Sequence, residues 1–143
     1  MLVSNSSTII LIAKITLLSK FLDTVNNVAI TNVIYREIIK KDSFENIIIK
    51  KEVEKGRIKI KSFEEKFYLS ALKQFKLDEG EASTFALCKN RKYKAILTDD
   101  EELIKICKIE GIRFISAMAI VAKLFKKKII SKNLDKIQEF AYD

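Results

Sequence analysis

The feature that most constrains the fold is an alternation of short apolar runs with longer segments of helical periodicity. The first, second and fourth apolar runs are continuously apolar at their centres, which is typical of strands buried on both faces of a sheet. Repeated alternation of strand and helix predicts an α/β fold of three layers, with a central parallel sheet and helices on both faces. The predicted strands are Met1–Ser4, Asn27–Ile30, Arg57–Lys61, Ala95–Thr98 and Arg113–Ile115.

Helical periodicity, in which apolar residues recur every three or four positions, fills the segments between these strands. Gly56 and Gly111 stand where two of the helices should end, just before a strand. The pattern is weakest in Ser43–Lys76. The predicted helices are Thr8–Leu22, Asn32–Lys41, Ser43–Lys55, Glu64–Lys76, Glu79–Lys92, Glu101–Glu110, Ala117–Lys127 and Asn133–Tyr142.

The length of 143 residues suffices for one domain with its own core, and we expect a single domain over residues 1–143. No apolar run reaches the roughly 18 residues of a membrane span, and the longest candidate, Ile9–Leu18, is interrupted by Lys14. Cys88 and Cys107 stand far apart and form neither a CxxC pair nor a disulfide framework. We therefore expect a cytoplasmic protein that has no membrane partner.

The absence of histidine limits the possible chemistry. It excludes Ser-His-Asp triads, Cys-His pairs and His-containing zinc sites, so that catalysis must use carboxylates, lysines, hydroxyls or a hard metal ion. The net charge of +8 and the pI of about 9.4 favour a polyanionic partner such as nucleic acid. Because most of the basic residues are lysines, the same charge also suits an ordinary solvated surface.

Several polar residues follow predicted strands or begin the helices after them. In an open parallel sheet, functional side chains gather at the carboxyl ends of the strands. A helix that starts near those ends presents its first turn to the same crevice. The residues expected at this edge are Asn5, Thr31, Glu81, Asp99, Asp100 and Ser116.

Two of these acids also match the pattern of a helix N-terminal cap. Asp99 with Glu102, and Asp78 with Glu81, have the spacing of a capping box. Taken alone, Asp99 fits a cap better than a metal ligand. Gly80 stands in the first helical turn, where glycine costs about 1 kcal/mol against alanine. A glycine at this position suggests that another group approaches the backbone closely.

Glu37 and Asn5 are each open to two interpretations. An ion pair with Lys41, four positions further along the helix, would explain Glu37. Otherwise, its apolar surroundings require a cation or a hydrogen-bond donor. Asn5 opens a run of small polar residues that suits either a ligand-facing turn or a helix cap. Carboxylates that converge on one crevice repel each other and call for Mg²⁺ or Mn²⁺, an ion that orients a phosphodiester and activates water.

Together, these stretches resemble a PIN domain, in particular the branch related to VapC-type toxins. The most specific marks are Gly-Glu-Ala at residues 80–82 and Thr-Asp-Asp at residues 98–100, in order and about the right distance apart. The resemblance spans nearly the whole chain, and the stretches that carry it are Val3–Lys14, Ile30–Ile38, Leu77–Ser83, Ile96–Asp100, Gly111–Ile112 and Ala122–Ile130.

The resemblance implies a parallel sheet of strand order 3-2-1-4-5 with a Mg²⁺ or Mn²⁺ site at its carboxyl edge. Such proteins are commonly endoribonucleases, often dimeric and often paired with an antitoxin. The expected partners are therefore RNA, an antitoxin protein and a second copy of the chain. The implied catalytic residues and metal ligands are Asn5, Glu37, Glu81 and Asp99, with Asp100 as a further metal ligand and Ser6 and Ser7 as contacts of the phosphate or of metal-bound water.

Asn5 departs from the family pattern, which has an aspartate at this position. An asparagine offers a carbonyl oxygen but no charge, and it accepts a proton poorly. We therefore expect weaker ion binding and an activity that is reduced by orders of magnitude or abolished. Either the natural protein is a degenerate member, or an aspartate has been exchanged to silence a toxic nuclease. The alternative function is a non-catalytic PIN-like module that binds RNA or a protein.

Three further expectations concern other functions and the surface. Residues 4–8 contain no glycine, which excludes a dinucleotide-binding turn and a P-loop. Lys126–Lys128 are expected to form a solvated helix end. Apolar residues of the segment 43–76 are candidates either for a dimer surface or for ordinary core packing, namely Phe44, Ile47, Phe67 and Leu72.

Overall fold

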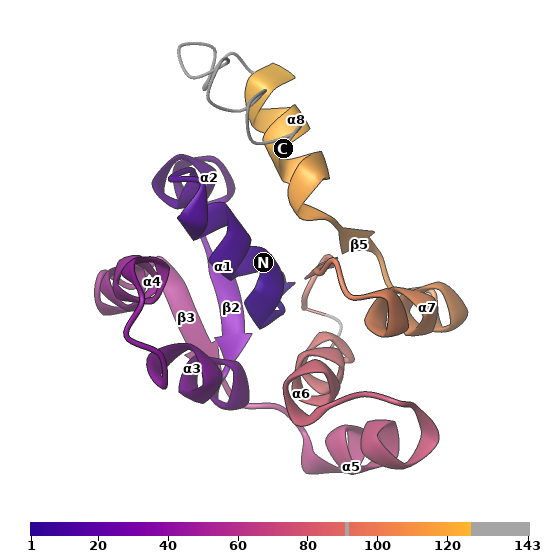
Figure 1. The fold of residues 1–143 in the computed structure, drawn as a ribbon. Coiled ribbons are helices and arrows are strands. Elements are labelled where there is room, and N and C mark those ends of the chain that lie inside the picture. The colour runs from indigo at the N-terminus through magenta and orange to yellow at the C-terminus, as the bar shows by residue number, and fades with distance from the viewer. Residues whose placement is uncertain (91, 127–143) are drawn as a thin grey trace.

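Five parallel strands form one sheet of order β3-β2-β1-β4-β5 in the computed structural model, which describes residues 1–90 and 92–126 (Figure 1). The α/β class, the parallel pairing and the strand order are those predicted. The strands are β1 (Leu2–Ser4), β2 (Val28–Thr31), β3 (Ile58–Lys61), β4 (Ile96–Leu97) and β5 (Phe114–Ile115).

Helices cover both faces of this sheet (Figure 1). One face packs against α1 (Ser6–Lys14), α2 (Leu18–Val25), α3 (Asn32–Ile39), α4 (Phe44–Glu54) and α8 (Ala117–Lys126). The other face packs against α5 (Glu65–Gln74), α6 (Glu79–Cys88) and α7 (Glu101–Glu110). The predicted three layers are therefore present.

Alternation of side chains along the strands divides the core in two. Val28 and Ile30 of β2 belong to the cluster on the α1 side, whereas Ala29 between them belongs to the cluster on the α6 side. Leu97 and Ile96 of β4 divide in the same way. Because successive strand residues point to opposite faces, these short strands support two hydrophobic layers at once.

The prediction of one helix over Thr8–Leu22 is wrong, since the structure has α1 and α2 in its place. Thr16 has a φ of 64°, in the left-handed region. The Leu17 amide donates to the Ile12 carbonyl at 3.1 Å, and the Thr16 amide donates to the Ala13 carbonyl at 3.0 Å. These two bonds form a Schellman motif, which usually contains glycine. The pattern gave no stop signal because threonine occupies the left-handed position.

The other described elements agree with the prediction apart from their ends. Gly56 and Gly111 have φ values of 79° and 69° and stand at the ends of α4 and α7, as expected. Helix α6 stops before its predicted end at Lys92. The predicted helix Asn133–Tyr142 and the residue Lys127 lie outside the described residues. Among residues 1–90 and 92–126, no helix has the length and apolar character needed to cross a membrane.

Candidate active site

The carboxyl ends of β1, β2, β4 and β5 meet at one edge of the sheet, because the pairing is parallel throughout. Asn5 directly follows β1, and its backbone amide donates to the Leu97 carbonyl of β4 at 2.9 Å. This bond fixes the start of α1 beside the end of β4. Asp99 and Asp100 follow β4 after one intervening residue, so both stand at the same edge.

Asn5 occupies the N-cap position of α1 without acting as a cap. Its side chain accepts no hydrogen bond from the first turn of α1. The residue is only 4% exposed, and no described residue forms a hydrogen bond with its amide group. The interpretation of Asn5 as an ordinary cap is therefore wrong. The Asn5 amide is a candidate ligand group because of its place at the carboxyl end of β1 and not because it is an orphaned buried group, since among the described residues the buried side-chain polar atom without a hydrogen-bond partner is Asn46 Oδ1.

Glu37 extends from α3 to the first turn of α6. Burial raises the pKa of Glu37 above its ordinary value, while a hydrogen bond from Ser6 Oγ to Glu37 Oε2 at 3.2 Å acts in the opposite direction. A Cβ on Gly80 would collide with Glu37 Oε1. The predicted close approach at Gly80 is thus confirmed, and Glu37 is the group that approaches. In the described part of the chain, Glu37 forms no ion pair with Lys41, and its donor is Ser6.

Glu81 is the second acid at this edge whose pKa is raised. The Glu81 amide donates to Asp78 Oδ1 at 2.8 Å and the Asp78 amide donates to Glu81 Oε1 at 2.9 Å, which is the predicted capping box. Burial, together with the adjoining carboxyls of Asp100 and Asp78, raises the pKa of Glu81 to about 7. A proton or a cation relieves the repulsion between such neighbouring carboxylates.

Asp100, and not Asp99, is the N-cap of α7. The Asp100 carboxyl accepts a hydrogen bond from the backbone of the first turn of α7 at 2.9 Å. Asp99 instead connects α1 with α8, since Thr8 Oγ1 donates to Asp99 Oδ2 at 2.6 Å and the Ala117 amide donates to the same oxygen at 3.2 Å. The prediction that Asp99 caps α7 together with Glu102 is therefore wrong, because the cap lies one residue further along.

Sequence reasoning missed Thr8, which is fully buried and holds Asp99. The available signal was its place in the first turn of α1, directly after β1. The structure also gives Thr31 a role as the N-cap of α3, with its hydroxyl 2.7 Å from Ser83 Oγ of α6. Ser7 is exposed, and no side-chain hydrogen bond links it to another described residue.

The donor chemistry of this edge fits a hard divalent cation, which prefers carboxylate and carbonyl oxygens. The carboxyl groups of Glu37, Glu81, Asp99 and Asp100 and the amide of Asn5 supply such oxygens, and each of the four acids also accepts at least one hydrogen bond from the protein. No three acidic or cysteine side chains among the described residues lie close enough together to hold a metal ion. The edge thus offers a carboxyl pair and a neutral amide, with two further acids nearby in the fold.

The parallel sheet of order 3-2-1-4-5, covered by helices on both faces, defines the protein as a three-layer α/β domain whose candidate site lies at the carboxyl edge of the sheet. A family model described as a PIN domain matches residues 1–142. The chain therefore belongs to the PIN domain family, a family of nucleases that typically use divalent metals. No curated protein matches the chain.

Proposed function

We propose that this chain is a toxin-like, metal-dependent endoribonuclease of the PIN type, whose activity is weakened or abolished by Asn5. The observation that carries the proposal is the Asn5 side chain, which is buried at the carboxyl end of β1 and neither caps α1 nor bonds to a described residue. Its position between the ends of β1 and β4, where the acids gather, supports a role in binding a ligand.

The proposed ion is Mg²⁺ or Mn²⁺. When bound, such an ion activates water and neutralises charge on the phosphate. Ser7 is exposed and free to contact the RNA phosphate, whereas Ser6 positions Glu37. Asn5 gives the site one negative charge fewer than an aspartate, which weakens the attraction for the ion. The proposed ligands and catalytic residues are Asn5, Glu37, Glu81, Asp99 and Asp100.

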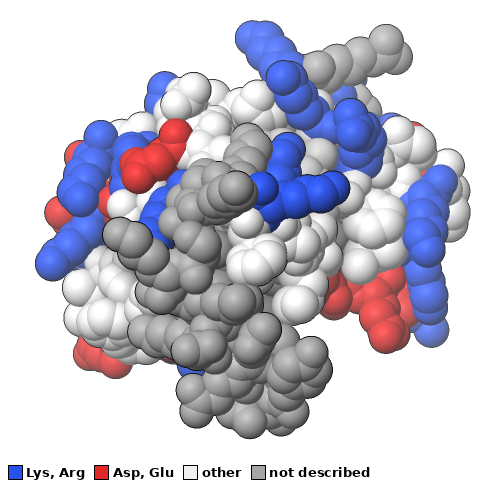
Figure 2. Space-filling view, turned by 90° about the horizontal axis from the view of Figure 1, so that it is seen from above, with Lys and Arg blue, Asp and Glu red and all other residues white. Residues whose placement is uncertain are grey.

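RNA is the proposed substrate. In its hydrolysis a bond forms between the water oxygen and phosphorus, and the bond from phosphorus to the leaving oxygen breaks as that oxygen takes up a proton. The net charge of +8 supports attraction of a polyanion. On the face seen from above in Figure 2, lysine and arginine side chains cover more of the surface than acidic ones do.

The decisive experiment is Mn²⁺ calorimetry with an RNA-cleavage assay on this protein and on Asn5→Asp. We expect Asn5→Asp to bind Mn²⁺ about ten-fold tighter or more, a difference of about 1.4 kcal/mol, and to cleave RNA. Asn90→Asp is the matched control, since it adds the same charge at an exposed position. If neither protein binds the ion, the nuclease proposal fails and the non-catalytic module, which the neutral Asn5 favours, takes its place.

An antitoxin protein and a second copy of the chain are further proposed partners. Phe44 and Ile47 of α4 are 66% and 54% exposed, so the surface expected to dimerise is accessible. Phe67 and Leu72 are partly buried, and Leu72 packs against the core on the α6 side. Sedimentation should show a dimer for the unchanged chain and a monomer for Phe44→Glu. If both proteins sediment as monomers, the proposed dimer is contradicted.

A further inference from the structure

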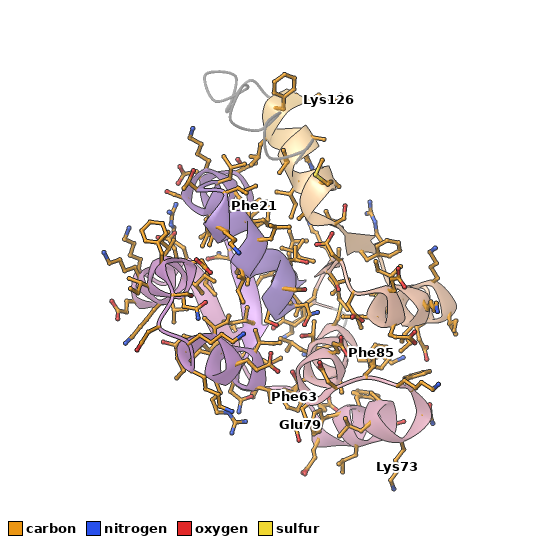
Figure 3. All side chains as sticks on the ribbon, viewed as in Figure 1. Phe21, Phe63, Lys73, Glu79, Phe85 and Lys126 are labelled. Atoms are coloured by element: carbon orange, nitrogen blue, oxygen red, sulfur yellow. The ribbon has the colours of Figure 1, made fainter. Side chains whose placement is uncertain are left out.

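The first turn of α1 brings hydroxyl groups to two of the acids at the carboxyl edge. Helix α1 starts at Ser6, one residue after the end of β1, at the end of the molecule where Glu79 lies in Figure 3. Ser6 Oγ donates to Glu37 of α3, and Thr8 Oγ1 donates to Asp99, which follows β4. The proposed nuclease function gives Ser6 a role and leaves Thr8 without one.

Thr8 and Asp99 differ in their exposure. Thr8 is fully buried, whereas Asp99 is exposed. The hydrogen bond from Thr8 Oγ1 to Asp99 Oδ2 is short, at 2.6 Å. A buried donor that loses its partner is costly, so the Thr8 hydroxyl favours the one orientation of Asp99 in which this bond is made. An exposed aspartate without such a bond would exchange among several rotamers.

The hydrogen bonds of Asp99 occupy one of its two carboxyl oxygens more fully than the other. Each oxygen of a carboxylate can accept about two hydrogen bonds. Oδ2 accepts from Thr8 Oγ1 at 2.6 Å and from the Ala117 amide at 3.2 Å, whereas Oδ1 shares only the Ala117 amide, at 3.3 Å. Within the described part of the chain, Oδ1 thus keeps an acceptor position, and it belongs to an exposed side chain at the carboxyl edge.

The packing of α1 and α8 does not by itself require the Thr8 hydroxyl. The first turn of α8 has a hydrogen bond of its own, since the Ala119 amide donates to Ser116 Oγ at 3.1 Å. Helix α1 is anchored beside Thr8 by Ile9 and Ile12, which are fully buried in the core. A valine at position 8 would fill nearly the same space, so the hydroxyl serves the carboxyl that it contacts.

We infer that Thr8 is a positioning residue of the carboxyl edge, which orients Asp99 so that Oδ1 is presented to the ion. Thr8 itself contacts neither the ion nor the RNA. The inference rests on the proposed function, because it concerns the same site. Removal of a group that orients a metal ligand through a hydrogen bond typically lowers metal affinity or activity roughly 10- to 100-fold. Together, Ser6 and Thr8 would let one turn of α1 hold acids from two other segments.

Mn²⁺ calorimetry on the full chain carrying Asn5→Asp tests this inference. In this background Thr8→Val should weaken Mn²⁺ binding roughly ten-fold or more, whereas Thr8→Ser, which keeps the hydroxyl, should retain most of the affinity. Thr24→Val is the matched control and should leave the affinity unchanged. It removes a hydroxyl that donates to the Lys20 carbonyl within α2 at 3.0 Å, at the opposite edge of the sheet.

A double-mutant cycle with Asp99→Ala shows whether Thr8 acts through Asp99. Once that carboxyl is absent, Thr8→Val should cause no further loss of Mn²⁺ affinity, and additive losses would contradict the inference. A purely structural Thr8 would lower the melting temperature without Mn²⁺ and leave the affinity unchanged. Unchanged binding by Thr8→Val overturns this inference alone, whereas the nuclease proposal fails together with it if Asn5→Asp itself binds no Mn²⁺.

Discussion

Gly80 determines how closely Glu37 approaches α6. A Cβ at this position would collide with Glu37 Oε1 and lie 3.0 Å from Ile34 Cδ1. The carboxyl is the flexible end of its side chain, so it can move away at low cost. We therefore expect Gly80→Ala to change the stability by less than about 1 kcal/mol, because alanine also gains helix propensity. In the Asn5→Asp background it should weaken Mn²⁺ binding several-fold, as measured by calorimetry.

A double-mutant cycle with Glu37→Gln separates this effect from a general disturbance. If Gly80→Ala acts by displacing the Glu37 carboxyl, it should have no further effect on Mn²⁺ affinity once that carboxyl is absent. Additive losses would contradict the proposed role of Gly80.

Glu81 should make stability depend on pH. Burial and neighbouring carboxyls raise its pKa from an ordinary value of 4.5 to about 7 in the folded chain. The folded state thus holds a proton that the unfolded state releases, so this contribution to stability is complete below pH 4.5 and is lost as the pH rises through about 7. Glu81→Gln keeps the capping box and removes the charge. Its melting temperature should exceed that of the unchanged chain at pH 8 and not at pH 4.

Glu65→Gln is the control for this pH series, since Glu65 is an exposed acid in the first turn of α5. Its melting temperature should follow that of the unchanged chain across the whole range. If both variants raise the melting temperature equally at pH 8, or if Glu81→Gln does not raise it, the pKa of Glu81 is not raised in the folded state.

At the scale of elements, the turn between α1 and α2 stores strain in Thr16. A left-handed conformation costs a residue with a Cβ about 1–2 kcal/mol, and glycine loses part of this gain through its greater freedom in the unfolded chain. We expect Thr16→Gly to raise stability by roughly 0.5–1 kcal/mol, or about 2 °C in melting temperature. Thr16→Ala keeps the Cβ and should give no comparable gain. A loss of stability in Thr16→Gly would contradict this account.

The elements also show which parts of the fold and site were predictable. Apolar runs and helical periodicity predicted the sheet and its layers, because burial on two faces leaves a pattern in neighbouring residues. The contact between Thr8 and Asp99 left no such pattern, because it joins side chains that are 91 positions apart. The break at Thr16 was missed because its signal is a backbone angle that threonine rarely adopts.

At the scale of the whole molecule, the charge of +8 should govern binding to RNA. A protein that displaces a few counterions from single-stranded RNA loses affinity about ten-fold between roughly 50 and 200 mM salt. We expect this slope for binding of the unchanged chain to an unstructured RNA, measured by fluorescence anisotropy. Lys123→Glu or a similar single reversal should reduce the slope only slightly if many lysines contribute. Affinity that is independent of salt would exclude an electrostatic mode of binding.

The proposed ligands at the carboxyl edge come from segments that are widely separated along the chain, from Asn5 after β1 to Asp100 before α7. No fragment that ends before Asp100 contains the full set, and β4 must join the sheet before Asp99 and Asp100 reach the edge. If the edge cleaves RNA, a chain still emerging from the ribosome cannot do so until most of it has been made. Synthesis from the amino end would then keep the nascent protein harmless to the RNA that encodes it.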